Sequence, residues 1–165
     1  IGWAFNARLA SMMASSISVT GAMFTFLSLV TGAFWGKPTW GTWWAWDPRI
    51  VSQLFLLFFF LGYIGLRSAI DDTDRADRAS AVLAIVGVIN VPIVRYSVDW
   101  WNSLHQAPSV MRADGPTIWS GAMLWPLLLM ALAYTFYFAW IMLTRARAEV
   151  LRRDRGSSWV REVLS

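Results

Sequence analysis

The sequence predicts an all-α protein, a polytopic transmembrane helical bundle with four spans in this chain. Hydrophobic residues make up 57% of its 165 residues and charged residues only 15%, which is too apolar for a small soluble domain. Charged residues are also absent from four stretches of membrane length, given that roughly 20 residues are needed to cross hydrocarbon. These stretches are 9–36, 50–66, 79–94 and 115–144.

The charge pattern divides the chain into spans and connecting segments. The third uncharged stretch is the shortest, but Arg95 near its end can extend its side chain to the headgroups, so the stretch is accepted as a span. The opening residues IGWAF resemble the last turn of a preceding span, which predicts that the chain is a fragment. The expected order is the end of a span at 1–8, transmembrane helices at 9–36, 50–70, 79–98 and 117–144, outer loops at 37–49 and 99–116, an inner loop at 71–78, and a basic cytoplasmic tail at 145–165.

The basic residues predict the orientation of the spans. Ten Lys and Arg residues lie on the side of the chain ends and four on the opposite side, so the ends are predicted to face the cytoplasm or a mitochondrial matrix. The inner loop reads as a solvated connector, with Asp residues suited to cap the helix that begins near Ala79. The tail is interpreted as a surface helix on anionic lipid, with docking of a cytoplasmic partner as the alternative.

Several classes of function are excluded by what the sequence lacks. Cysteine is absent, which excludes disulfides, thiolate metal ligands and thioether attachment of a cofactor, so any cofactor must be held noncovalently. Neither a glycine-rich phosphate loop nor a set of Ser, His and acid suggests catalysis, and no catalytic residue is predicted. The net charge of +4 comes from arginines near membrane boundaries, which favours a lipid bilayer over nucleic acid as the partner.

Tryptophan is concentrated on the predicted outer side. An interfacial belt would place Trp at both water boundaries, yet eight lie near the outer side and two, Trp3 and Trp159, near the inner side. Exposed indoles in a loop need a neighbour to pack against, and a flat macrocycle such as haem fits them. The outer tryptophans are Trp35, Trp40, Trp43, Trp44, Trp46, Trp100, Trp101 and Trp119.

The first outer loop contains the segment WGTWWAWDPR at 40–49. If residues 39–47 form a short helix, Trp40, Trp43, Trp44 and Asp47 share one face. Asp47, followed by a proline, is also expected to be the N-cap of the helix that starts at Ile50. The capping role and a role at a binding site are compatible.

Cations near the outer loops are candidates to meet the two propionates of haem. Arg49 is the first choice because it lies at a helix start, where an anion is stabilised. Lys37, Arg95 and Arg112 are the alternatives, and for all four the ordinary interpretation is contact with lipid headgroups.

The second outer loop contains VDWWNSLHQ, with Trp100, Trp101 and His105, the one histidine of the sequence. A single histidine at a membrane interface is more often a polar boundary residue than a ligand. Its place beside two indoles favours the other interpretation, because neutral imidazole is a standard axial ligand of haem iron. Asn102 or Asp99 could orient the ring.

Polar residues also occur within the predicted spans. Asn90 and Pro92 lie in the third span, and Ser52 and Gln53 begin the second span just under the first outer loop. Polar groups in lipid need partners, so helix packing is favoured for these residues and the wall of a pocket is the alternative.

Two motifs resemble those of a known family, the haem exporter protein C (CcmC) branch of the haem-handling proteins of cytochrome c maturation, which carry a tryptophan-rich WWD loop. The motifs are GAFWGKPTWGTWWAWDPR at 32–49 and NVPIVRYSVDWWNSLHQ at 90–106. The resemblance runs through essentially the whole chain. It implies six spans in the full protein, haem b bound noncovalently along the loop, His105 as an axial ligand, and a second histidine upstream of Ile1. The loop positions that match are Trp35, Trp40, Trp43, Trp44, Trp46 and Asp47.

The resemblance also implies a function and a set of partners. Haem would be presented at the outer face to a periplasmic haem chaperone, with help from a small single-span membrane protein and an ABC-type ATPase with its membrane subunit. The location would be the bacterial inner membrane, with the mitochondrial inner membrane less favoured. Two alternatives stay open: a relative of the haem-attaching cytochrome c synthetases, which is an enzyme, and a structural membrane subunit without haem.

Overall fold

A computed structural model describes residues 8–106, residue 109 and residues 121–160. Within these residues the chain forms four α-helices and no strand: α1 (Arg8–Trp40), α2 (Pro48–Ala69), α3 (Thr73–Trp100) and α4 (Gly121–Arg153). Each helix is long and apolar enough to cross a membrane. The structure therefore confirms the predicted fold class, an all-α transmembrane bundle with four spans in this chain.

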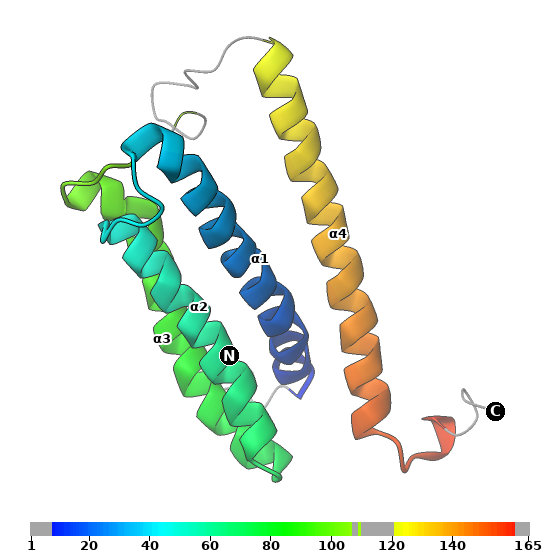
Figure 1. Cartoon of the computed structure of the whole chain (residues 1–165). Helices are drawn as coiled ribbons and strands as arrows, with labels where there is room; N and C mark the ends of the chain where they lie inside the picture. Colours follow the sequence, from blue (N-terminus) through cyan, green and yellow to red (C-terminus); the bar gives the residue numbers. More distant parts are fainter. Residues whose placement is uncertain (1–7, 107–108, 110–120, 161–165) are drawn as a thin grey trace.

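The helices are arranged so that both outer loops lie at the same end. α2 and α3 lie side by side, α1 packs against α2, and α4 packs against the other side of α1 (Figure 1). The end of α1, the start of α2, the end of α3 and the start of α4 are all at the upper end in Figure 1. This common end brings the two predicted outer loops within reach of each other.

The helices bury small polar residues and expose large apolar ones, as expected of spans surrounded by lipid. Ser16 and Thr25 of α1 are buried, and each donates its hydroxyl proton to a carbonyl one turn earlier, at 2.9 and 2.8 Å. Polar groups in hydrocarbon must be satisfied internally, and small side chains allow helices to approach closely. The exposed apolar side chains include Phe26, Phe55, Val88, Leu129 and Phe136.

Close approach between helices depends on glycine and on one amide. A Cβ atom at Gly21 would lie 2.5 Å from the Phe60 ring, so the glycine allows α2 to pack against α1. Between α2 and α3, the Asn90 side-chain amide donates to the Ser52 carbonyl at 2.8 Å, and both residues are buried. Asn90 and Ser52 therefore serve helix packing.

Residues 41–47 of the first outer loop are not helical, so the short helix considered for residues 39–47 does not form, while α1 extends past its expected end at residue 36. α1 continues to Trp40 and ends at Gly41, whose φ of +78° lies in the left-handed region that favours glycine. The Gly41 amide donates to the Lys37 carbonyl at 3.1 Å, which completes the last turn. Residues 41–47 then run as irregular chain to Pro48, and a residue before proline disfavours helical geometry.

The inner end also differs from the prediction. Residues 71–78 were expected to form a solvated connector, but α3 already begins at Thr73 because Asp72 caps it, accepting from the amides of Asp74 and Arg75 at 2.9 and 3.0 Å. These hydrogen bonds keep the pKa of the Asp72 carboxyl below its ordinary value.

Ion pairs join the inner ends of α2, α3 and α4. Asp77 of α3 pairs with Arg67 of α2 and, at 3.0 Å, with Arg153 of α4. Glu149 also pairs with Arg153, at 2.9 Å. Residues 145–153, predicted as part of a separate tail, thus continue α4 and join it to the α2 and α3 ends.

Candidate functional site: the two outer loops

The tryptophans of the first outer loop form edge-to-face pairs rather than one platform. Trp35 contacts Trp40 with ring centroids 5.2 Å apart, and Trp44 contacts Trp46 at 5.7 Å. Trp43 packs against Phe34 at 5.5 Å. Trp46 is 80% exposed, so its indole has apolar surface available for a further partner. The shared helical face expected for Trp40, Trp43, Trp44 and Asp47 is absent because this segment is not helical.

Asp47 is the polar centre of the outer end. Its side chain is only 2% exposed. One carboxylate oxygen, Oδ2, accepts from the Arg49 amide at 3.0 Å, which confirms the predicted N-cap of α2. The other oxygen, Oδ1, accepts from the Leu104 amide at 2.7 Å. A single carboxylate therefore joins the start of α2 to the second outer loop.

His105 lies against this carboxylate and against the first loop. Its Nδ1 is 2.9 Å from Asp47 Oδ2, and its ring is 4.6 Å from the Trp40 ring at an interplanar angle of 66°. The His105 backbone amide donates a hydrogen bond to the Ser103 hydroxyl oxygen at 3.1 Å, which helps to order this part of the loop. The structure thus brings together Trp40, Asp47 and His105, which sequence reasoning had placed in two separate loops.

The local electrostatics keep Asp47 ionised and His105 neutral. Burial alone would raise the pKa of the Asp47 carboxyl, but hydrogen bonds from Ser103, Leu104, Arg49 and His105 outweigh it and hold the pKa below 3.8. Burial lowers the pKa of His105 below 6.5, and the opposing effect of Asp47 does not cancel it. An ionised carboxylate can only accept, so Nδ1 carries the proton and Nε2 carries the lone pair.

The orienting partner of His105 differs from our expectation. Asn102 and Asp99 were the candidates, but Asn102 is exposed and the Asp99 carboxylate lies 3.8 Å from the Arg95 guanidinium. Asp47 takes this place instead. The sequence contained one signal for this role of Asp47: capping a helix uses one hydrogen bond of a carboxylate, which can accept several more.

The candidate cations differ in what surrounds them. Lys37 donates to the Gly41 carbonyl at 3.1 Å, and Arg95 lies over the Tyr96 ring at 5.2 Å. The charge of Arg49 acts on His105 and helps to lower the pKa of that imidazole. Arg49 is therefore the cation associated with the histidine, while Arg112 lies outside the described residues.

Trp100 and Trp101 belong to a second aromatic group at the end of α3. The Trp100 ring stacks on Tyr96 with centroids 5.6 Å apart, and Trp101 meets Trp100 edge to face at 5.9 Å. Both indoles are exposed. The predicted tryptophans therefore form separate groups at the outer end, and Trp119 lies outside the described residues.

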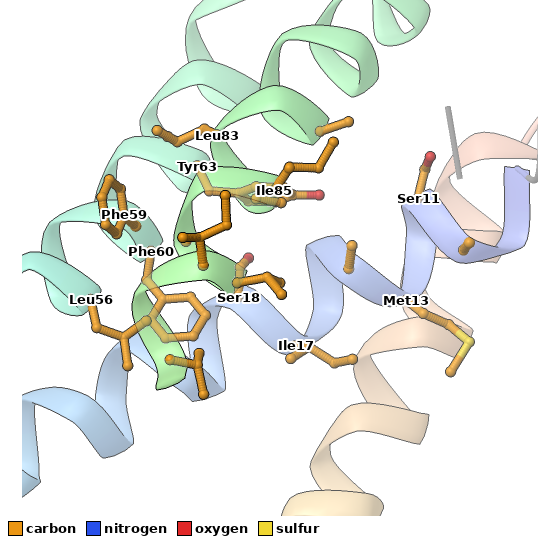
Figure 2. Close-up of a pocket in the computed structure, with 18 of the residues that line it drawn as sticks. Ser11, Met13, Ile17, Ser18, Leu56, Phe59, Phe60, Tyr63, Leu83 and Ile85 are labelled. Atoms are coloured by element: carbon orange, nitrogen blue, oxygen red, sulfur yellow. The ribbon is translucent and has the colours of Figure 1, made fainter. Parts of the chain in front are cut away.

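A groove of about 720 Å³ lies between α1, α2 and α3, below the outer loops (Figure 2). Its lining is mostly apolar, as the labelled side chains Met13, Ile17, Phe60 and Leu83 show. It contains no histidine and none of the predicted site residues. The chemistry of metal coordination therefore points to the outer loops and not to this groove.

Within the described part of the chain, no three His, Cys, Asp or Glu side chains gather closely enough to hold a metal ion. A porphyrin brings four nitrogen ligands of its own, so iron held in one would need only an axial ligand such as Nε2. Together the fold and this end of the bundle define a polytopic membrane protein with an aromatic surface and an oriented imidazole at the end formed by the two loops.

Comparison with known proteins agrees with this class. The profile of the family described as heme exporter protein C (CcmC) matches residues 1–161, and the chain belongs to this family. It is 50% identical over 145 residues to the heme exporter protein C of Bradyrhizobium diazoefficiens, covering 88% of this chain and 55% of that protein.

Two further relatives carry the same name. The identity is 43% over 141 residues for the protein of Haemophilus influenzae, covering 86% of this chain and 57% of the relative. It is 40% over 164 residues for that of Escherichia coli, covering 99% and 65%. The chain thus spans 55 to 65% of the length of these three relatives.

The lowered pKa of His105 predicts how the contact between the loops depends on pH. Protonation favours the separated loops when the folded pKa lies below 6.5, so the contact is fully stabilised above pH 6.5 and weakens as pH falls from there toward the lowered pKa. A ¹⁵N NMR titration of full-length protein in which only this segment carries labelled histidine reports His105 directly, because the segment contains one histidine. A pKa at or above 6.5 would contradict the account.

Proposed function

We propose that the outer loops bind haem noncovalently and hold it for transfer in cytochrome c maturation. The observation that carries the proposal is the hydrogen bond of 2.9 Å between His105 Nδ1 and Asp47 Oδ2. It fixes the tautomer that leaves the Nε2 lone pair for iron, the arrangement that metal-binding histidines commonly use. His105 would then be an axial ligand of the haem.

The surrounding residues suit the rest of a haem molecule. Exposed indoles of Trp43 and Trp46 offer apolar surface for the macrocycle, and Trp100 and Trp101 offer more at the end of α3. Arg49 would meet a propionate, because its charge lies near His105 and at the start of α2, where a helix favours anions. Absence of cysteine from the chain supports noncovalent binding of haem b.

Family membership supports the wider role. The relatives are named heme exporter proteins, a name that describes transport and not catalysis, and this favours a haem-handling protein over a haem-attaching enzyme. We place the outer loops on the periplasmic face of the bacterial inner membrane, in line with the distribution of Lys and Arg.

The whole protein would act with partners. Haem would pass to a periplasmic haem chaperone, assisted by a small single-span membrane protein and by an ABC-type ATPase with its membrane subunit. The relatives are longer than this chain, and a second axial ligand would come from a residue outside it. His105 supplies one side of the iron in this proposal.

Replacement of His105 by alanine tests the ligand. Purified full-length protein should show a Soret band, and His105→Ala should lose most of its haem and change the remaining visible bands, because the iron loses an imidazole. Gln106→Ala is the control, since Gln106 is an exposed neighbour. Retention of the wild-type spectrum by His105→Ala would remove the ligand assignment, and a wild-type protein without any Soret band would favour the structural subunit.

Replacement of Arg49 tests the propionate contact. Arg49→Ala should bind haem about three- to tenfold more weakly, because a charge-assisted hydrogen bond at a partly exposed site is lost, while membrane insertion stays normal. Haem titration in detergent measures the difference. The matched control is Arg75→Ala at the inner end, whose side chain is 79% exposed. Equal haem affinity of Arg49→Ala and wild type would place the propionates elsewhere.

A further inference from the structure

Asp47 is placed to do more than cap a helix. Its buried carboxylate accepts a hydrogen bond from the Arg49 amide at the start of α2. It also accepts hydrogen bonds from the Leu104 amide and the His105 imidazole of the second loop. These hydrogen bonds come from segments more than 50 residues apart in the sequence. One side chain thus fixes where the second loop lies on the first.

The geometry points to Asp47 as the positioning residue of the haem ligand: through its hydrogen bond to Nδ1 it both orients His105 and makes the imidazole a stronger electron donor to the iron. This inference rests on the proposed function, because it concerns the same haem site. A metal-bound imidazole becomes a more basic ligand when its other ring nitrogen donates a hydrogen bond to a carboxylate. A more basic ligand favours ferric over ferrous haem.

The local chemistry favours a strong effect. The Asp47 side chain is 2% exposed and that of His105 is 22% exposed, so water competes weakly for the hydrogen bond between them. Both oxygens of the carboxylate accept backbone hydrogen bonds, which suits an anion, and a hydrogen bond from the imidazole to an anion is charge-assisted.

Asp99, another acidic residue at the described outer end, lacks this geometry. Asp99 is at the end of α3, its side chain is 49% exposed, and its carboxylate faces Arg95 at 3.8 Å. It has the same chemistry as Asp47 but no hydrogen bond to the histidine. Asp99→Asn is therefore a matched control for Asp47→Asn.

The first test is the reduction potential of haem bound to the full-length protein. Asp47→Asn keeps the shape of the side chain and removes its charge, and should shift the ferric-to-ferrous preference about tenfold toward ferrous haem, a rise of about 59 mV for a one-electron couple. Asp99→Asn should leave the potential at the wild-type value. An unchanged potential in Asp47→Asn that still binds haem would overturn the inference and leave the proposed function intact.

The second test needs no haem and covers variants that fail to bind it. Asp47→Ser keeps a good N-cap residue for α2 but cannot supply a carboxylate to His105. In ¹⁵N NMR spectra of full-length protein with labelled histidine in this segment alone, wild type should show the proton fixed on Nδ1, and Asp47→Ser should show both tautomers. A fixed Nδ1 proton in Asp47→Ser would also overturn the inference. Absence of haem from the wild type would refute the proposed function. The tautomer spectra would then still show whether Asp47 orients the His105 imidazole.

Discussion

The outer end of this protein depends on one buried hydrogen-bonding group, the carboxylate of Asp47. Burial of a charge is costly unless donors surround it, and here amides from α2 and from the second loop, together with the His105 imidazole, supply them. The same contacts begin α2, seat the second loop and set the tautomer of the histidine. Trp40 then packs against a ring whose position is already determined. The chemistry of the proposed haem site therefore follows from how one carboxylate is satisfied.

The membrane-spanning helices are held together by different interactions from those at the outer end. Lipid surrounds the large apolar side chains, so the helices are held together by close approach at Gly21, by the amide of Asn90 and by backbone hydrogen bonds inside each helix. At the inner end, ion pairs of Asp77 and Glu149 tie α4 to the α2 and α3 pair. Polar contacts thus join the segments at each end of the bundle. The packing of the spans determines how close the two outer loops come to each other.

The sequence predicts the features that depend on local composition. Uncharged stretches predict the four spans because a charge in hydrocarbon is expensive, and Asp47 followed by Pro48 predicts an N-cap. The contact of Asp47 with His105 spans 58 residues and depends on how α1, α2 and α3 pack, so no local pattern reveals it. The short helix considered for 39–47 does not form because the glycine at 41 ends α1, and α3 starts earlier than Ala79 because Asp72, rather than a later residue, caps it.

The central claim is that His105 binds the iron of haem through Nε2 while Nδ1 stays on Asp47. Pulsed electron paramagnetic resonance of ferric haem bound to full-length protein tests it most directly when histidine carries ¹⁵N at Nε2 alone. Because this chain contains one histidine, a version in which only that residue is labelled is accessible by segmental labelling. The account predicts a strong hyperfine coupling from a directly coordinated ¹⁵N nucleus. A spectrum with no such coupling would show that the iron is held by other groups, and the account would be wrong.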